Sequence, residues 1–305
     1  MRASASVGWI QRLSPATAAT LALVGVTAAW GSTFVLVKDA VARMPVMDFL
    51  TLRFGLAAAV MVLLRPRATA TLGPSGWRAG ALLGLALGAG YVAQTAGLQY
   101  TAATVSGFIT GMFVVFTPVV AAVVLRRPAG PAAWVGVGLA TVGLAVLSLR
   151  GFALGFGETL TLLCALLFAV HIVGLGEWAP RHDSYALAVV QLATVALACA
   201  LIAAPGGLTA PPDLTAWFAV LVTAVFATAV AFVAQTWAQA RLSATRAAVV
   251  MTMEPVFAGI FGVLVGGDEL GARTVVGAAL VLAAMYVVEL SPRRRKVPPV
   301  ERLES

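Results

Sequence analysis

Ten apolar runs follow one another along the 305-residue chain, and they restrict its fold more than any other feature. A helix needs about 20 apolar residues to cross the hydrocarbon core of a bilayer. Only 10% of the residues are charged and 61% are hydrophobic, which is too little polar surface for a water-soluble protein. The sequence therefore predicts an all-α polytopic membrane protein with ten transmembrane helices. The runs are residues 17–37, 49–64, 77–98, 103–125, 131–149, 154–175, 185–204, 214–238, 244–265 and 274–290.

The distribution of basic residues predicts the orientation of these spans. If the N-terminus is cytoplasmic, 15 of the 20 lysines and arginines lie in cytoplasmic segments. Because basic residues favour the cytoplasmic side, we expect both termini, residues 1–16 and 291–305, in the cytoplasm. The membrane would be the inner membrane of the cell. This orientation signal accounts for the net charge of +8, and no nucleic-acid partner is expected. The N-terminus resembles a signal peptide, but the many later runs favour an uncleaved first span.

Weak internal similarity divides the spans into two repeats of five, at residues 17–149 and 154–290. Residues 30–53 align on residues 168–191 without a gap, and Thr117–Ala121 aligns more clearly on Glu254–Ala258. Because each repeat has an odd number of spans, the second must run in the opposite sense across the membrane. Such inverted repeats place a substrate near the midplane between the halves.

Motifs for enzymatic chemistry are absent from the sequence. There is no Walker A sequence, no Gly-x-Gly-x-x-Gly fingerprint, no HExxH and no Gly-x-Ser-x-Gly elbow. Cys164 and Cys199 lie inside apolar runs, and His171 and His182 are separated by a loop. We therefore expect neither a metal site nor a cofactor, and not an enzyme.

Two charged residues inside spans are the most informative, because lipid cannot solvate them. Arg53 lies in the second span, after a short charged bend that follows the first. It either snorkels to the interface or faces a cavity, where it binds an anionic group or pairs with an acid. Glu254 lies near the middle of the ninth span and is either a proton site or a counter-charge to Arg53 or Arg246.

Two prolines inside spans remove backbone hydrogen bonds. Pro118 in the fourth span frees the carbonyl of Val114, and Pro255 in the ninth frees that of Met251. Both are candidates for hinge or gating positions, and simple packing kinks are the alternative. The glycines that recur every four residues in spans three and four favour close helix packing.

Several neutral polar and aromatic side chains within spans complete the predicted substrate site. An interior lined by amide and aromatic groups suits a small amphipathic solute, although hydrogen bonds between helices are the simpler explanation for any single one. Trp30 lies near the centre of its span, unlike a head-group anchor. The predicted substrate-binding residues are Trp30, Thr33, Arg53, Tyr91, Gln94, His171, Gln191, Gln235 and Glu254.

Six segments of the sequence carry a family resemblance. They are AAWGSTFVLVKDAV (28–41), LRFGLAA (52–58), GLQYTAATVSGFITGMFVVFTPV (97–119), GVGLATVGLAVL (136–147), VVQLATVALA (189–198) and AQTWAQARLSATRAAVVMTMEPVFAGIFGVLVGGDEL (234–270). Taken in order, these segments resemble the drug/metabolite transporter superfamily, in its EamA-type branch. The resemblance covers roughly residues 20–290.

This resemblance implies ten helices in two inverted repeats, cytoplasmic termini, and export of amino acids, related metabolites or drugs by a secondary carrier. Trp30, Arg53, Gln191, Glu254-Pro255 and Glu269 stand at the family's recurring positions. The sequence departs from the family pattern at Arg126-Arg127, where an acid is usual, and at Phe168, where a tryptophan is usual.

We therefore expect a transporter of small organic solutes that works by alternating access. Its partners would be a solute and the lipid bilayer, and a homo-oligomer is left open. Because Arg53 aligns with neutral Gln191, the cavity would be positive on one side, which favours a solute with an anionic end. The rival functions are a membrane-embedded enzyme acting on lipid-linked substrates, with Glu177, Arg181, His182 and Asp183 as scattered candidates, and a non-transporting scaffold.

Overall fold

The structure, a computed structural model, describes residues 14–126, 130–148, 154–251 and 253–290. Within these ranges every regular element is a helix. The predictions about most of the two tails and about Arg127 lie outside the described residues. The helices are α1 (Pro15–Arg43), α2 (Val46–Leu64), η2 (Ala68–Thr71), α3 (Pro74–Leu98), α4 (Ala103–Thr110), α5 (Phe113–Val124), α6 (Pro131–Ser148), α7 (Phe156–Trp178), η3 (Ala179–Arg181), α8 (Ser184–Ala203), η4 (Ala204–Gly206), α9 (Leu214–Ala224), η5 (Val225–Val230), α10 (Ala231–Gln239), α11 (Ala244–Val250), α12 (Met253–Leu264) and α13 (Ala272–Leu290).

Seven helical stretches of the described chain are long and apolar enough to cross a membrane, and three further apolar helices are shorter. Large apolar side chains cover the outside of the bundle. Leu63, Leu214 and Leu264 are 79%, 87% and 76% exposed, as expected where lipid tails are the solvent. The all-helical, multi-pass membrane fold is thus confirmed, and the count of ten spans stays a prediction.

At the start of α1, the hydroxyl of Ser14 accepts a hydrogen bond from the Thr17 N–H (3.1 Å) and caps the helix. At its other end, the connection between the first two spans is shorter than the sequence suggested. The expected charged bend is instead the last turns of α1, which continues to Arg43, so that only Met44 and Pro45 separate it from α2. The proline suits this place because it stands just before the first turn of α2, where no backbone N–H is needed.

The eighth expected span contains the π-helical turn η5 between α9 and α10, and two other spans are each divided into two α-helices. The fourth breaks at residues 111–112, between α4 and α5, and the ninth breaks between residues 250 and 253, where α11 gives way to α12. The two breaks fall at similar places in the two repeats. Broken helices are tolerated at membrane depth where protein or a cavity satisfies the freed backbone groups.

The prolines lie beyond these breaks rather than at them. Pro118 is inside α5, whereas Pro255 is in the first turn of α12, where a proline costs no hydrogen bond. The prediction of a bare carbonyl at Met251 is wrong, because this oxygen accepts a hydrogen bond from the Glu254 N–H (3.0 Å). The gating role of both prolines stays a prediction.

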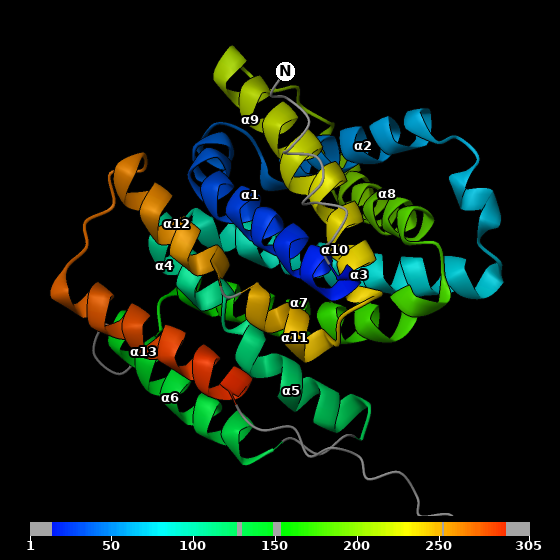
Figure 1. Cartoon of the computed structure of the whole chain (residues 1–305). Helices are drawn as coiled ribbons and strands as arrows, with labels where there is room; N and C mark the ends of the chain where they lie inside the picture. Colours follow the sequence, from blue (N-terminus) through cyan, green and yellow to red (C-terminus); the bar gives the residue numbers. More distant parts are fainter. Residues whose placement is uncertain (1–13, 127–129, 149–153, 252, 291–305) are drawn as a thin grey trace, which may run out of the picture.

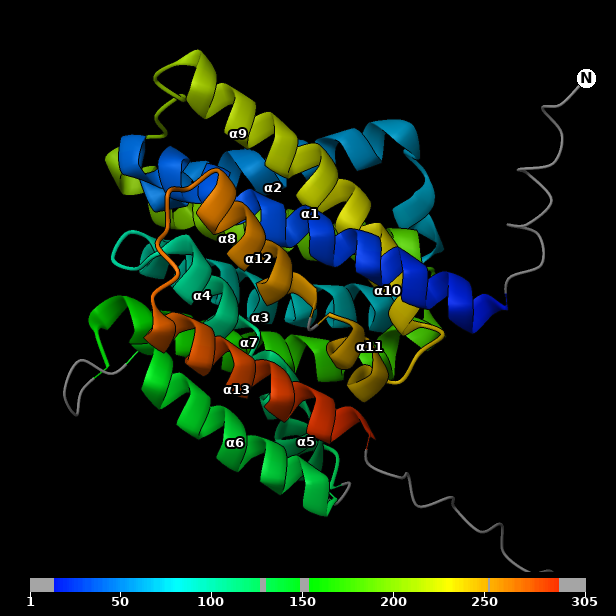
Figure 2. The same cartoon turned by 60° about the vertical axis from the view of Figure 1, so that its left-hand side comes forward.

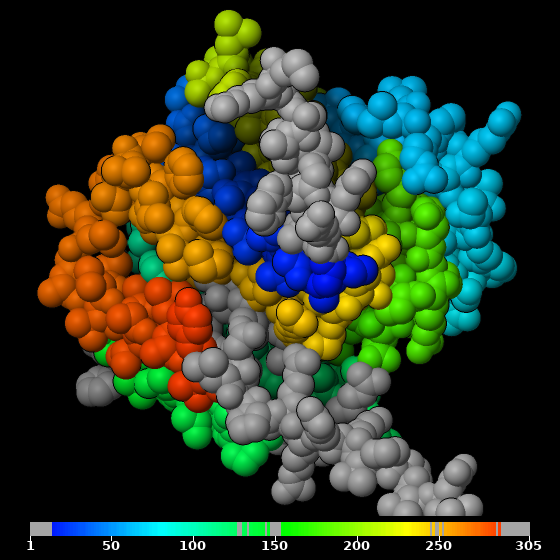
Figure 3. All heavy atoms as spheres, viewed as in Figure 1, coloured from blue at the N-terminus to red at the C-terminus, as the bar shows by residue number. Residues whose placement is uncertain are grey.

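Helices at corresponding places in the two repeats pack in exchanged pairs. α6 lies along α13, α2 along α8, α4 along α12, and α5 along α11. In the same way, α1 packs on α10 and α12, whereas its counterpart α7 packs on α3 and α5. Figures 1 and 2 both show α6 beside α13 at one edge of the bundle. Figure 3 shows the face of Figure 1 with all atoms, with α12 and α13 on one flank and the α2–α3 connection on the other. Each contact between two helices thus has a counterpart in which the two repeats are exchanged, as a two-fold arrangement of the repeats requires.

Glycines allow the closest of these helix crossings. A Cβ atom on Gly84 would lie 2.7 Å from a backbone carbonyl of α8, and one on Gly107 would clash with the Cβ of Ala258. A Cβ on Gly31 would lie 2.6 Å from the Glu254 carbonyl where α1 crosses α12. The packing interpretation of the glycine stripes is therefore correct at Gly84 and Gly107.

Candidate functional site

An internal cavity of about 40 Å³ lies between helices of both repeats. Eight of the nine predicted substrate-binding residues line it, and they come from α1, α2, α3, α7, α10 and α12. The ninth, Gln191, lies behind the wall. The lining residues are Trp30, Thr33, Phe34, Val37, Arg53, Leu87, Tyr91, Gln94, Leu98, Phe113, Phe168, His171, Ile172, Phe232, Gln235, Met251 and Glu254.

Arg53 brings a positive charge into this cavity. Its side chain is buried, and Arg53 as a whole is only 3% exposed, so the snorkelling alternative is wrong. Its Nε donates to Thr228 Oγ1 (2.8 Å) and its Nη2 to the carbonyl of Ala227 (3.4 Å). The guanidinium carbon also lies 4.9 Å from the ring centroid of Tyr91, a cation–π contact. Among the described residues no acid forms an ion pair with Arg53.

The partners of Arg53 belong to η5, a π-helical turn that the sequence did not reveal. The Ala231 N–H bonds to the carbonyl of Phe226, five residues back, instead of the carbonyl of Ala227, four residues back. The Ala227 oxygen accepts instead from Trp30 Nε1 (2.8 Å) as well as from Arg53. A wide π turn thus offers side chains of α1 and α2 an acceptor that a regular α-helix would use internally.

His171 and Gln191 form a buried pair across α7 and α8. His171 Nε2 lies 2.7 Å from Gln191 Oε1, and Gln191 Nε2 donates to the carbonyl of Leu187 (3.1 Å). Because an amide oxygen can only accept, this amide orientation makes Nε2 of His171 the donor of the hydrogen bond. Gln191 therefore meets the cavity only through His171, and a direct contact with substrate stays a prediction for it.

Glu254 faces the cavity from the first turn of α12 and is 4% exposed. Its carboxylate has neither a hydrogen bond nor an ion pair with any described residue. Arg246 is exposed, and Arg53 is bound to η5 instead. The hypothesis of a direct counter-charge pair with either arginine is therefore wrong for this conformation.

Glutamines supply the neutral polar groups. Gln94 Nε2 donates to Thr110 Oγ1 (3.1 Å), which joins α3 to α4. Gln239 Nε2 donates to the carbonyl of Ile172 (3.1 Å), which joins α10 to α7. Both hydrogen bonds run between helices, and Gln94 lines the cavity as well. Gln235 lies at the cavity, and its Oε1, like that of Gln239, is buried without a hydrogen-bond donor among the described residues. A buried acceptor of this kind needs a partner.

Aromatic rings form most of the remaining wall. Phe232 lies 5.4 Å from Trp30 and 6.1 Å from Tyr91 between ring centroids. Tyr91 also lies 5.0 Å from Phe54 and 5.1 Å from Phe168 in edge-on contacts. Sequence reasoning missed Phe232, because a phenylalanine in an apolar run gives no sign of whether it faces lipid or a cavity. The site combines one cation, one acid, amides and aromatic faces.

Polar contacts between the repeats close one end of the bundle. Each joins a residue of 17–149 to a residue of 154–290, and those of Arg43 and Asp48 lie near the end of α1 and the start of α9. The contacts are Arg43 Nη1 to Asp213 Oδ2 (2.9 Å), Thr209 N to Asp48 Oδ2 (3.0 Å), Thr101 Oγ1 to Glu158 Oε1 (3.4 Å) and Thr104 N to Asp268 Oδ2 (2.8 Å). The Thr209 hydroxyl donates a second hydrogen bond to Asp48.

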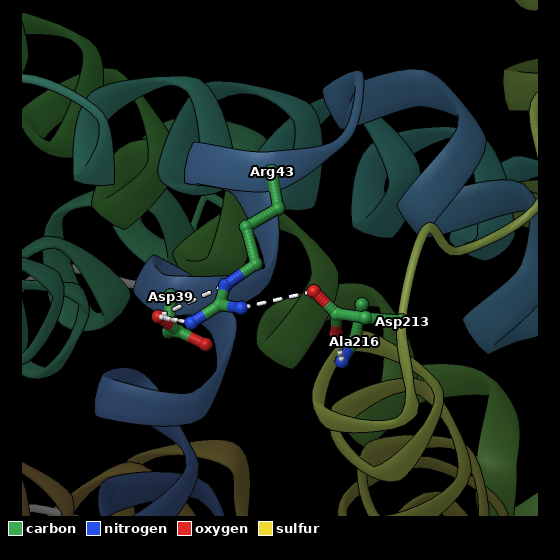
Figure 4. A network of polar contacts seen from close by, with 4 residues as sticks. All are labelled: Asp39, Arg43, Asp213 and Ala216. Atoms are coloured by element: carbon green, nitrogen blue, oxygen red, sulfur yellow. Dashed lines mark hydrogen bonds and ion pairs between the residues drawn. The ribbon is translucent and has the colours of Figure 1, made fainter.

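Asp213 has two partners in this closed end (Figure 4). Its carboxylate accepts from the Ala216 N–H (2.8 Å) as the cap of α9, and Arg43 reaches it while also pairing with Asp39 (3.0 Å). The Ala216 N–H, followed by the Arg43 guanidinium, lowers the pKa of Asp213 from its ordinary value. Both side chains are about two-fifths exposed, so the ion pair itself stabilises the fold little.

Comparisons with known proteins agree with this architecture. The sequence model of the EamA-like transporter family matches residues 17–149 and again residues 155–290. A protein of Archaeoglobus fulgidus named "Uncharacterized transporter" is 34% identical over 275 residues, which cover 89% of this chain and 86% of that protein. A solved crystal structure superposes with a TM-score of 0.67 at 22% identity, over 89% of this chain and 96% of that one, and shares the fold.

Proposed function

The chain belongs to the EamA-like transporter family, and from that premise we propose that it is a secondary exporter of small organic metabolites that carry an anionic group. Amino acids and amphipathic drugs are the foremost candidates. The membrane would be the cytoplasmic membrane, with both chain ends inside the cell. The direction of transport comes from the resemblance to exporters described above, and the substrate class comes from the cavity.

One observation carries the substrate class: the guanidinium of Arg53 lines a buried cavity without an acidic partner among the described residues. A buried charge without a counter-ion is costly. A carboxylate or phosphate of a solute would supply that counter-ion and accept the N–H groups that η5 leaves free. The aromatic wall and the free Oε1 of Gln235 suit the apolar and donor groups of the same solute.

Alternating access is the mechanism that fits the shape of the cavity. Small-molecule sites usually measure about 300–1,000 Å³, whereas this cavity measures about 40 Å³. The helices must therefore separate to admit a metabolite. The contacts that join the two repeats at one end are the bonds such a movement would break. We propose that the two repeats rock against each other, with α5 and α12 beginning at the cavity between them.

The carrier is driven either by a proton gradient or by the solute gradient alone, and Glu254 and His171 are the candidate proton-binding residues. Both face the cavity and both can bind a proton, so proton coupling is one mechanism. Facilitated diffusion down the solute gradient is the other. A pH gradient imposed across a vesicle membrane accelerates the first and leaves the second unchanged.

A panel of amino acids, organic anions and amphipathic drugs should be tested for flux in proteoliposomes. We expect Arg53→Gln to abolish flux of the anionic solute and Arg78→Gln, at an exposed arginine, to leave it at the wild-type rate. If no solute moves, or if Arg53→Gln and Glu254→Gln both behave as wild type, the carrier proposal fails. The scaffold function would then be favoured. No observation favours the enzyme, since Asp183, one of its candidates, caps α8.

A further inference from the structure

A second hollow, a groove of about 990 Å³, opens on the side of the bundle. Its walls are the last turns of α2, the η3 turn with the start of α8, and one face of η5 and α10. We call it the α2–α10 groove. It is lined by Val60, Met61, Leu64, Arg65, Ala179, Pro180, His182, Asp183, Ser184, Tyr185, Val225, Ala229, Val230, Val233, Ala234, Trp237, Ala240 and Arg241.

The long wall of the groove is apolar and continuous with the lipid-facing surface. Leu64 and Val230 are 73% and 58% exposed, and Val60 and Val233 are partly exposed beside them. In a protein that crosses a bilayer, hydrocarbon chains surround such a surface. A groove of this kind therefore meets acyl chains before it meets any water-soluble molecule.

One end of the groove carries two arginines, each held against an aromatic ring of the lining. The guanidinium carbon of Arg65 lies 4.8 Å from the ring centroid of Tyr185, and that of Arg241 lies 4.3 Å from the ring of Trp237. Arg241 also donates from Nη1 to the carbonyl of Trp237 (2.9 Å). Stacking fixes the plane of a guanidinium and leaves N–H groups at its edge for a phosphate.

The other polar groups of the groove do not neutralise these arginines. Asp183 is the only acid of the lining, and its carboxylate accepts the Ala186 N–H (2.8 Å) as the cap of α8. Tyr185 donates its hydroxyl to the carbonyl of Met61 (2.7 Å). Among the described residues, neither arginine has an acidic partner within ion-pair distance. The polar end thus has an excess of positive charge.

We propose that the α2–α10 groove binds one anionic glycerophospholipid. Its phosphate would contact Arg65 and Arg241, and an acyl chain would lie along the apolar wall of α2 and α10. The arginines stand where helices end, which is the level of lipid head groups. The apolar wall favours a lipid over a free anion, which would gain nothing from it. The site is separate from the central cavity, so the proposal does not depend on the proposed function.

Binding can be measured on the purified full-length protein in detergent after removal of native lipid. Phosphatidylglycerol and phosphatidylcholine with identical chains are titrated, and bound lipid is counted by native mass spectrometry. We expect phosphatidylglycerol to bind about tenfold more tightly or better, because each basic residue near the head group adds to the attraction. Equal affinities of the two lipids would overturn the proposal.

Matched double variants locate the site. Arg65→Gln with Arg241→Gln should remove the preference for phosphatidylglycerol. Arg78→Gln with Arg246→Gln removes the same charge from exposed arginines outside the groove and should preserve the preference. If both double variants lose it equally, the attraction comes from net charge alone and the groove is not the site. Glycerol phosphate, which has the head group without chains, should not displace the lipid; displacement would indicate an anion site instead.

Trp237 provides a direct probe of the acyl chain. The difference in fluorescence between wild type and Trp237→Phe isolates the emission of this side chain. Phosphatidylglycerol with brominated chains should quench it more strongly than brominated phosphatidylcholine. In the Arg65→Gln, Arg241→Gln variant the two lipids should quench it equally. Quenching that does not distinguish the lipids in wild type would contradict the proposal.

Discussion

Replacement of Gly31 by alanine tests the crossing of α1 and α12 beside the central cavity. An added Cβ would lie 2.5 Å from the Cβ of Phe257, 2.6 Å from the carbonyl oxygen of Glu254 and 2.8 Å from the N atom of Ala258. Two of these three atoms belong to the backbone, so no rotamer change can relieve the clash. Ordinary contact begins near 3.4 Å, and the two helices must therefore move apart.

Overpacking of this kind costs about 1–3 kcal/mol. A second effect acts in the opposite direction, because alanine removes the conformational freedom of glycine in the unfolded chain and stabilises by about 0.4–1 kcal/mol. Gly25 in the same helix supplies the control, since a Cβ there meets nothing within 4 Å. The entropic effect is common to both variants, so the difference between them isolates the overpacking, at about 1–3 kcal/mol.

The assay is thermal unfolding of both purified variants in the same mild detergent. In domains of comparable size each kcal/mol shifts the melting midpoint by about 2–4 °C. We expect the melting midpoint of Gly31→Ala to lie at least about 2 °C below that of Gly25→Ala. The flux of Gly31→Ala should also fall, because Glu254 is displaced. Equal melting midpoints would refute the reasoning, since they would mean that the two helices do not touch at Gly31.

Three further predictions concern η5 and the closed end. Trp30→Phe keeps an aromatic side chain but removes the five-membered ring with its N–H donor to the Ala227 carbonyl. It should destabilise the protein in chemical unfolding by at least about 0.5–1.5 kcal/mol for the lost hydrogen bond, and the void left by the smaller ring adds to this; an unchanged midpoint would contradict it. Thr228→Val keeps the shape but removes the acceptor of Arg53 Nε, and should cost about 1.5–3 kcal/mol, whereas serine at this position should restore most of it. Asp213→Ala should lower the melting midpoint at neutral pH. Because the folded-state pKa of Asp213 is lowered, its contribution is complete above its ordinary pKa and is lost as pH falls through the folded value. The difference from wild type should therefore vanish in strong acid, and a difference that grows there would refute the assignment.

Residues whose charged side chains are costly to expose to lipid could be placed from the sequence. Arg53 and Glu254 face the cavity as expected, because a charge in so apolar a chain has few other places to lie. Trp30 and His171 were found through their central position and the gapless alignment of the repeats. The all-helical membrane fold followed from the apolar runs themselves, since a spanning segment must satisfy its backbone internally.

Features that depend on contacts between distant segments could not be predicted. The π turn η5 leaves no mark in a uniformly apolar run, so the partners of Arg53 stayed hidden. Glu254 lines the same cavity as Arg53 without forming an ion pair with it, because a direct pair depends on side-chain reach, which spacing does not give. Phe232 lines the cavity rather than lipid because of packing alone. Gln191 lies one layer behind the cavity, since His171 occupies the place in front of it.

The π turn also makes the length of this segment matter as much as its residues. A π turn accommodates one residue more than an α-helix of the same pitch, and each residue advances an α-helix by about 100°. Deletion of a single residue within Val225–Val230 would let the segment become α-helical without turning α10, because the π turn absorbs its extra residue locally. Phe232 and Gln235 would stay on the cavity wall, but the carbonyl that accepts from Trp30 and Arg53 would be taken by an N–H of its own helix. If the segment instead became α-helical with all its residues, α10 would turn by about 100° and both side chains would leave the wall. One extra residue thus supplies the acceptor that holds α1 and α2 against this helix.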